Sequence, residues 1–372
     1  MAKLGEVCLL KAGKFVSAND ISPEYNKGLY PCFGGNGIRG YVADYTHDGE
    51  FPLIGRQGAL CGNVNLASGK FHATEHAVVV QPKIEMNVHW LYYALNAMNL
   101  GQYATGAAQP GLAVSKLETL SIEIPNISEQ NKIAQTLYKV EQLVNFRKQQ
   151  LAKLDELVKA RFVEMFGDPD QNPKGWPLVS ITEIIRDKAS NGFFAKRDAY
   201  KDDGNVQILG VSNVVNRMYS NTKELPRTNA TQAEKEKYSV KYGDMLFCRS
   251  SLVADGIGKA SIVAKGTFPN VLFECHVIRL SLDLQKCVPE FVQVLSTTPF
   301  FRRQIIAQSK TATMTTIGQD GILKSSVVLP PIDLQNQFAA FVERVDQQKQ
   351  TVQQSLEKLE LMKKALMQEY FG

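Results

Sequence analysis

Two stretches of this chain share an apolar pattern in which the spacing alternates between four and three residues. In the first stretch, 125–167, the pattern consists of Ile133, Leu137, Val140, Val144, Leu151, Leu154, Val158 and Met165. In the second, 330–372, it consists of Phe338, Val342, Val345, Val352, Leu356, Leu359, Leu366 and Tyr370. This spacing is typical of a coiled-coil seam held over about five heptads. It predicts two long helices whose seams are interrupted by Arg147, Arg161, Lys349 and Lys363.

The ends of both helices also carry start and stop signals. Ser128 and Asp333 occupy matching positions near the start, and both residue types favour the N-cap. Each stretch finishes in Phe-Gly, a typical helix stop, and the first continues with Asp168-Pro169.

The two stretches are copies of each other. Residues 125–167 align without a gap on 330–372, at a constant shift of 205 positions. Identities include the helix lead-in, the seam and the Phe-Gly end. A period this long indicates a duplicated half rather than a solenoid repeat, and it predicts a protein with pseudo-two-fold symmetry.

Chain order predicts that the two helices run antiparallel and that Gly372 ends near the first globular part. The alternative is two separate amphipathic helices, each lying on its own domain. The apolar stripe is wider than a two-helix seam needs, which suggests that further helices dock there. The predicted partner-docking residues are Leu143, Leu157, Phe341 and Met362.

The remaining sequence predicts two globular heads. We expect a first head at 1–124, a central helix at 125–169, a second head at 170–329 and a C-terminal helix at 330–372. Both heads contain short β-type runs, and helices are expected at 88–99 and 288–308. A looser repeat, which aligns His76 with His276 and Arg56 with Arg249, predicts that both heads share one α+β fold.

Composition narrows the class of protein. The hydrophobic content of 44% and charged content of 21% are those of an ordinary globular chain, and no apolar run is long enough to span a membrane. The six cysteines lack CxxC spacing and indicate reduced residues in the cytoplasm. The net charge of +5 permits nucleic-acid binding without requiring it.

Two motifs could carry chemistry, and both have a simpler explanation. His72-Ala-Thr-Glu-His76 matches a zinc-peptidase pattern, but it runs into a predicted strand, on which the two histidines would lie about 13 Å apart. Phe33-Gly-Gly-Asn-Gly37 resembles a cofactor loop, yet strand and turn residues follow it. We therefore predict no metal, no cofactor and no catalytic residue.

DNA contact remains as a role for the heads, because Arg, Asn and Gln on turns read base edges and surface cations hold phosphates. Arg302 and Arg303 are further phosphate candidates. The predicted DNA-binding residues are Asn36, Arg39, Arg56, Gln57, Asn63, Lys196, Arg197, Asn213, Arg217, Arg249, Ser250 and Lys259.

The whole chain resembles the specificity subunits of type I restriction–modification enzymes. The resemblance rests on Tyr-Pro-Cys-Phe-Gly-Gly-Asn-Gly-Ile-Arg-Gly-Tyr (30–41), Ile-Gly-Arg-Gln-Gly (54–58), Tyr-Gly-Asp-Met-Leu-Phe-Cys-Arg (242–249), Leu-Pro-Pro-Ile-Asp-Leu-Gln (329–335) and both Phe-Gly ends. It departs at the first lead-in, 124–130, which has one proline where the second has two.

The resemblance implies two target recognition domains that read the halves of a bipartite site in double-stranded DNA. It also implies that the helices set the spacing and dock two modification (methyltransferase) subunits, which restriction (translocase and nuclease) subunits join. Helices of roughly 55 Å would limit the offset between half-sites to roughly 16 base pairs.

Three rival interpretations remain open at this stage. The heads could bind proteins, which would make the chain an interaction scaffold. The chain could be a hydrolase that uses His72, Glu75 and His76. It could also be a decoy specificity subunit that is never assembled.

Overall fold

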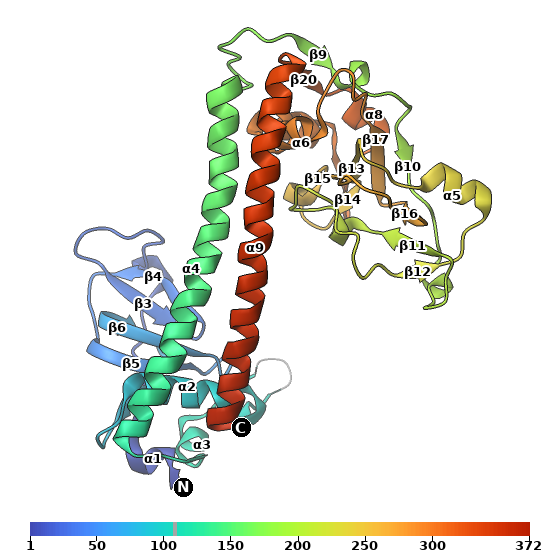
Figure 1. The fold of residues 1–372 in the computed structure, drawn as a ribbon. Helices are drawn as coiled ribbons and strands as arrows, with labels where there is room; N and C mark the ends of the chain where they lie inside the picture. Colours follow the sequence, from blue (N-terminus) through green and yellow to red (C-terminus); the bar gives the residue numbers. More distant parts are fainter. Residues whose placement is uncertain (107–109) are drawn as a thin grey trace. The chain divides into compact units, whose positions relative to one another are not determined.

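The computed structural model describes residues 1–106 and 110–372, which divide into two compact units. Unit 1 comprises Met1–Gln149 and Val352–Gly372, and unit 2 comprises Gln150–Thr351. Two 40-residue helices, α4 (Ile127–Phe166) and α9 (Ile332–Phe371), each contribute one part to each unit (Figure 1). Each unit therefore contains one head and a segment of both long helices.

The starts of the long helices differ slightly from the prediction. Helix α4 begins one residue before Ser128, and the side chain of Asn126 caps it by accepting the Glu129 N–H at 3.0 Å. Helix α9 begins directly after Pro331, whose fixed φ suits the entry to a first turn. Ser128 and Asp333 are therefore inside the first turn, and the prediction that they are N-caps was wrong.

The end of α4 follows the predicted stop signal. Gly167 has a φ of +81°, and its N–H bonds to the Val163 carbonyl at 2.8 Å. A Cβ at this position would lie 2.6 Å from the ring of Pro173. Glycine is therefore required here both by the left-handed backbone and by the close approach of the next segment.

The helix segments pair antiparallel within each unit, as predicted. In unit 1, Lys363 bonds to Glu141 at 2.6 Å, and Arg147 Nε donates to Ser355 Oγ at 3.1 Å. In unit 2, Lys349 bonds to Asp155 at 2.5 Å. Three of the polar interruptions of the seam thus hold the partner helix.

The C-terminal end of α9 also packs on the core of head 1, as expected for Gly372. Its residues Leu366, Met367, Tyr370 and Phe371 lie against that core. The rings of Phe371 and Trp90 are 6.4 Å apart.

Head 1 is built on a six-stranded sheet of order β2-β7-β5-β6-β3-β4. A short β1–β8 pair, three α-helices and two 3-10 helices (η1 and η2) complete the part of it that the structure describes. The elements are β1 (Ala2–Lys3), α1 (Leu4–Val7), β2 (Cys8–Ala12), η1 (Ala18–Asp20), β3 (Tyr30–Gly34), β4 (Gly37–Val42), β5 (His47–Gly55), β6 (Val64–Ala73), β7 (Ala77–Pro82), α2 (Val88–Ala97), η2 (Leu100–Tyr103), α3 (Val114–Glu118) and β8 (Ser121–Ile122).

Head 2 contains a four-stranded sheet of order β10-β17-β13-β15 and three smaller sheets. Its strands are β9 (Leu178–Ser180), β10 (Ser190–Asn191), β11 (Val206–Leu209), β12 (Arg227–Thr228), β13 (Asp244–Cys248), β14 (Ser250–Ser251), β15 (Ala260–Ile262), β16 (Val271–Phe273), β17 (Val277–Ser281), β18 (Lys310–Thr311), β19 (Thr315–Thr316) and β20 (Ser326–Val328). Its helices are η3 (Ile181–Glu183), η4 (Arg197–Ala199), η5 (Val211–Asn213), α5 (Gln232–Tyr238), η6 (Ala254–Gly256), α6 (Pro289–Thr297), α7 (Pro299–Gln308) and α8 (Gln319–Leu323).

The two heads share a topology, which confirms the prediction of a common fold. The strand order β2-β7-β5-β6 of head 1 corresponds to β10-β17-β13-β15 of head 2. In addition, β3 pairs parallel with β6 just as β11 pairs parallel with β16. The main difference is that the single long strand β6 is replaced by two short strands, β15 and β16.

The helix expected at 288–308 is broken into α6 and α7. Pro299 opens α7, and Thr298 caps it by accepting the Phe301 N–H at 3.5 Å. Proline has no N–H for a continuous helix and disfavours a helical residue before it, so the chain turns at Thr298.

The same pair of hydrogen bonds attaches the head to its long helix in both units. In unit 1, Gln130 accepts the Asn87 N–H at 2.9 Å and donates to the Pro125 carbonyl at 2.9 Å. In unit 2, Gln335 accepts the Val288 N–H at 2.9 Å and donates to the Pro330 carbonyl at 2.7 Å.

These glutamines are matched in the sequence repeat and almost fully buried. Each joins the first turn of a long helix to the start of a head helix, α2 or α6. The duplication therefore extends to the joint between helix and head.

Candidate nucleic-acid interface

The backbone of Arg56, in head 1, forms two hydrogen bonds beside the turn that joins β6 to β7. Its N–H donates to the His76 carbonyl at 3.0 Å, and its carbonyl accepts the Leu112 N–H at 2.9 Å. The side chain is half-buried. The backbone of this residue is thus fixed, while its side chain is only partly buried.

Arg249 of head 2 occupies the corresponding place. Its N–H donates to the His276 carbonyl at 2.9 Å, and its carbonyl accepts the Ile317 N–H at 3.0 Å. His276 and Ile317 are the residues that the sequence repeat aligns with His76 and Leu112. The equivalence of the two arginines, inferred from a loose alignment, is therefore confirmed at the level of the backbone.

The two arginines differ in their side-chain surroundings. Arg249 Nη1 donates to the Cys275 carbonyl at 3.3 Å, and the neighbouring Ser250 Oγ lies 3.4 Å from His276 Nδ1. Beside Arg56, His76 Nε2 instead lies 3.2 Å from a Glu75 carboxylate oxygen. The two arginines therefore share a backbone setting and differ in the groups around their side chains.

Other candidates of head 1 gather next to Arg56. Asn63 Nδ2 donates to Asn36 Oδ1 at 3.0 Å, and both side chains are exposed. The turn after β3 approaches this loop so closely that a Cβ at Gly55 would lie 2.0 Å from the Gly35 carbonyl oxygen. Gln57 follows Arg56 and is exposed, and Arg39 is exposed on β4.

The candidates of head 2 are more dispersed. Lys196 and Arg197 are exposed in the loop after β10. Asn213 uses its side-chain oxygen internally, accepting the Gly210 N–H at 3.1 Å. Arg303 forms an ion pair with Asp170. Their assignment as DNA contacts stays a prediction.

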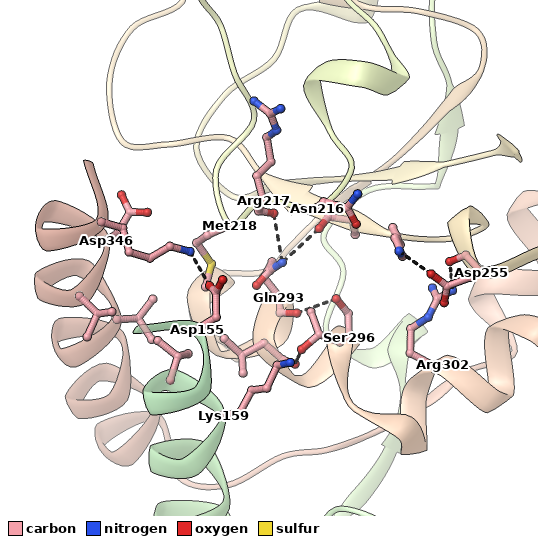
Figure 2. Close-up of a pocket in the computed structure, with 18 residues that line it drawn as sticks. Asp155, Lys159, Asn216, Arg217, Met218, Asp255, Gln293, Ser296, Arg302 and Asp346 are labelled. Atoms are coloured by element: carbon pink, nitrogen blue, oxygen red, sulfur yellow. Dashed lines mark hydrogen bonds and ion pairs between the residues drawn. The ribbon is translucent and has the colours of Figure 1, made fainter. Parts of the chain in front are cut away.

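Arg217, Lys259 and Arg302 line a pocket of about 440 Å³ between head 2 and the segments of α4 and α9 in unit 2 (Figure 2). Lys259 Nζ bonds to Asp255 at 2.7 Å, and Arg302 donates to the Asp255 carbonyl at 3.0 Å. The hydrogen bond and charge of Lys259 lower the pKa of Asp255. Asp255 therefore contacts both cations, and their assignment as phosphate contacts stays a prediction.

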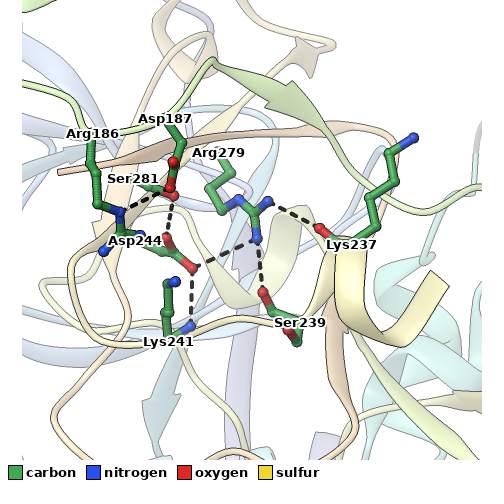
Figure 3. Close-up of polar contacts among 8 residues, drawn as sticks. All are labelled: Arg186, Asp187, Lys237, Ser239, Lys241, Asp244, Arg279 and Ser281. Atoms are coloured by element: carbon green, nitrogen blue, oxygen red, sulfur yellow. Dashed lines mark hydrogen bonds and ion pairs between the residues drawn. The ribbon is translucent and has the colours of Figure 1, made fainter. Parts of the chain in front are cut away.

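A polar cluster at the start of β13 is structural (Figure 3). Asp244 is fully buried; it accepts the Ser281 hydroxyl at 2.7 Å and the Lys241 N–H at 3.0 Å. Arg279 lies 3.9 Å away and donates to the carbonyls of Ser239 at 2.8 Å and Lys237 at 3.0 Å. Burial raises the pKa of Asp244 despite these partners. The cluster ties the end of α5 to the central sheet.

The zinc-like motif has a different geometry from the one expected. His72 is the second-last residue of β6, whereas His76 lies in the turn before β7, so the two do not share one strand. A turn forms because the residues from Thr74 to His76 leave the sheet, and the Ala77 N–H bonds back to the Thr74 carbonyl at 3.0 Å. His72 Nε2 faces the Lys14 carbonyl at 3.2 Å. In residues 1–106 and 110–372, no group of three or more His, Cys, Asp or Glu side chains is arranged to hold a metal ion.

The glycine-rich segment at 33–37 is a hairpin. It connects β3 to β4, and Gly37 has a φ of +97°. No helix follows the loop, so this segment lacks the helix N-terminus of a nucleotide site.

The predicted docking residues divide into two groups. Leu143, Leu157 and Met362 are exposed on the long helices. Phe341 is instead half-buried against the core of head 2, with Arg161 5.9 Å from its ring. Phe146 and Leu361, which were not among the predicted docking residues, are 58% and 68% exposed on the same helices. A helical wheel drawn opposite the seam would have identified both.

The predictions about cysteine pairing and membrane-spanning segments can also be compared with the described part of the chain. All six cysteines are unpaired. None of the described helices combines the length and the apolar character needed to cross a bilayer.

Comparison with known proteins supports the resemblance found in the sequence. Residues 1–156 match the family model of the type I restriction modification DNA specificity domain. The EcoprrI specificity subunit of Escherichia coli is 53% identical over 143 residues, which cover 38% of this chain and 36% of that protein. The EcoKI specificity subunit of E. coli K12 is 25% identical over 276 residues, covering 70% of this chain and 57% of that protein. The alignments thus span about a third to a little over half of these relatives.

A solved structure shows the same fold along the whole chain. The S subunit of a type I restriction–modification system from M. genitalium superposes with a TM-score of 0.66 at 15% identity, covering 100% of this chain and 95% of that one. This structure confirms the predicted fold class, two α+β heads joined by long paired helices. The resemblance to type I specificity subunits is confirmed by the family model and the relatives in sequence.

Proposed function

We propose that this chain, a relative of type I specificity subunits, is the DNA sequence-recognition subunit of a type I restriction–modification complex. The observation that carries the proposal is the equivalence of the heads. Each presents an arginine held by the same two backbone bonds, Arg56 in one head and Arg249 in the other. Each head is attached to its long helix by the same buried glutamine. One fold used twice with different side chains suits a bipartite DNA site whose halves differ.

In this proposal each head reads one half-site. The first head corresponds to 1–124 and the second to 170–329, with the helices at 125–169 and 330–372. Arg56 and Arg249 contact base edges, for which arginine has the appropriate bidentate geometry. Asn36 and Asn63 add contacts beside Arg56, since they share its surface and remain exposed.

The paired helices act as spacer and as docking surface. Their polar contacts, such as Lys363 with Glu141 and Lys349 with Asp155, fix the register of the antiparallel segments. Leu143, Leu157 and Met362 offer exposed apolar side chains to the modification subunits. Methyl transfer and DNA cleavage are the work of the partner subunits, and this chain is non-catalytic.

The test is methylation mapping in cells that express the chain with the modification subunit of its own system. The wild type should produce methylated adenines in one bipartite motif. Arg56→Ala should relax or weaken one half-site and Arg249→Ala the other, by about 5- to 150-fold per lost bidentate contact, corresponding to 1–3 kcal/mol. An equal loss of methylation at every sequence would instead identify the arginines as phosphate contacts.

Insertions test the spacer separately. One heptad added to both α4 and α9 near their midpoints should lengthen the gap and leave the half-sites unchanged. Altered half-sites with an unchanged gap would refute the role of the helices as spacer. A complex that assembles but methylates no specific sequence would favour a scaffold, and a chain that fails to assemble with the modification subunit would favour a decoy.

A further inference from the structure

Each head exposes a phenylalanine at the same place in its fold. Phe15 follows β2 and is 75% exposed, and Phe194 follows β10 and is 69% exposed. A single exposed apolar side chain is ordinary on a protein surface. Two exposed phenylalanines at equivalent positions of two heads, whose loops otherwise differ, indicate a shared role.

Backbone contacts establish the equivalence. The Gly13 N–H donates to the Ala77 carbonyl at 3.0 Å, and the Gly192 N–H donates to the Val277 carbonyl at 3.2 Å. Ala77 and Val277 begin the matching strands β7 and β17. Phe15 and Phe194 each lie two residues after these glycines. The two aromatic residues therefore leave the sheet at the same point.

Because Gly13 and Gly192 have no Cβ, each aromatic loop can pack closely on the backbone just before β7 or β17. A Cβ at Gly13 would lie 2.0 Å from the Ala73 carbonyl oxygen, and one at Gly192 would lie 2.2 Å from that of Glu274. Lys14 is bound as well, because its N–H donates to the Ala73 carbonyl at 2.9 Å. Each phenylalanine thus starts from a backbone that is held in place.

The same turn holds the arginine on its other flank. Arg56 donates its N–H to His76 of this turn, and Arg249 donates its N–H to His276. Cations flank the aromatic residues, with Lys14 before Phe15, and Lys196 and Arg197 shortly after Phe194. In each head, the backbone around one tight turn therefore contacts both the segment that carries the exposed phenylalanine and the arginine proposed to read bases, and cations lie close to the phenylalanine in the sequence.

We propose that Phe15 and Phe194 are apolar wedges that insert between base pairs of their half-sites. The inference rests on the DNA-reading function proposed above. Proteins that deform DNA insert apolar side chains at base steps, and base–aromatic stacking compensates for the lost stacking of the bases. The flanking cations suit the phosphates on either side of an opened step. The wedge would also make each head sensitive to the deformability of a step that its polar side chains do not read.

The experiment uses the full chain assembled with its modification subunit and a duplex containing the mapped site. 2-Aminopurine is placed at successive positions of each half-site, and its fluorescence reports local unstacking. We expect an increase at one step per half-site with the wild type. Phe15→Ala should abolish the signal in one half-site and Phe194→Ala in the other, with about tenfold weaker binding each. Phe15→Trp and Phe194→Trp should retain both signals.

Matched controls separate the wedge from a general loss of apolar surface. Ile84 and Leu284 are 47% and 43% exposed beyond the opposite ends of β7 and β17. Their alanine variants should bind and unstack DNA like the wild type. Because all four residues are exposed, every variant should also unfold at the wild-type denaturant midpoint.

The outcomes distinguish the two proposals. Sequence-specific binding by the wild type with no fluorescence change at any step would overturn the wedge and leave the DNA-reading function intact. Unchanged signals in both alanine variants would overturn it too. Absence of sequence-specific binding by the wild type would remove the proposed function itself.

Discussion

The buried glutamine that joins each head to its helix offers the sharpest test of how this fold is held together. In unit 2, Gln335 is fully buried and bridges the Val288 N–H and the Pro330 carbonyl. Gln335→Ala removes both bonds and leaves two backbone groups without their partner. The substitution also removes the buried Cγ and amide group of Gln335, which leaves a small cavity beside α9.

The expected cost follows from these two groups. A buried donor or acceptor left unsatisfied costs about 1–3 kcal/mol. With partial entry of water, the two together should destabilise unit 2 by about 3 kcal/mol. At a urea m-value of about 2 kcal/mol/M, the unfolding midpoint should fall by about 1.5 M. Gln130→Ala should cost less, about 2 kcal/mol, because the Asn87 end of its bridge is only partly buried.

The chain has two tryptophans, one in each unit, which allows the units to be followed separately. Trp90 is buried in head 1, and Trp176 donates its ring N–H to the Phe166 carbonyl of unit 2 at 2.9 Å. Trp90→Phe leaves Trp176 as the reporter for Gln335→Ala, and Trp176→Phe leaves Trp90 as the reporter for Gln130→Ala. Each variant is compared with its own tryptophan background.

The matched control is Gln347→Ala, the same substitution at an exposed position of α9 within unit 2. It should shift the midpoint by less than about 0.3 M, because only helix propensity changes. If Gln335→Ala behaved like this control, the bridge would contribute nothing to stability and the account of the joint would be wrong.

Three further predictions concern the packing of single groups. Because burial raises the pKa of Asp244, the folded state binds more protons than the unfolded state above the ordinary pKa of aspartate, so the stability of unit 2 should fall as pH rises through that window. Asp244→Asn, which can keep its bond to Ser281, should flatten this slope in urea titrations at several pH values; identical slopes would exclude the burial argument. Phe338→Ala removes a fully buried ring and should cost about 3–5 kcal/mol in calorimetry or denaturation, whereas a loss under 1 kcal/mol would mean that the site collapses freely. Lys363→Met breaks a half-exposed pair with Glu141 and should cost at most about 1 kcal/mol, a difference that should vanish in 1 M salt.

Local signals in the sequence were enough to predict the helical part of the fold. The heptad spacing and the Phe-Gly ends predicted α4 and α9, because seam residues and helix stops act over a few neighbouring positions. The exact starts were missed, since Asn126 and Pro331 compete locally with Ser128 and Asp333. The break at Thr298 was missed for the same reason, although Pro299 was visible in the sequence.

The heads show where local reasoning ends. The repeat alone aligned Arg56 with Arg249, because duplicated segments keep their residues even where the surrounding loops diverge. In each head, the arginine and an exposed phenylalanine come to lie beside the same turn through long-range pairing, in which β2 meets β7 and β10 meets β17. Likewise, the ion pair of Lys259 with Asp255 depends on the fold around η6 and could not be read from the sequence. Sequence determined which elements form and which residues recur; tertiary structure decided which of them share a surface, because contacts between distant strands depend on the packing of the whole head.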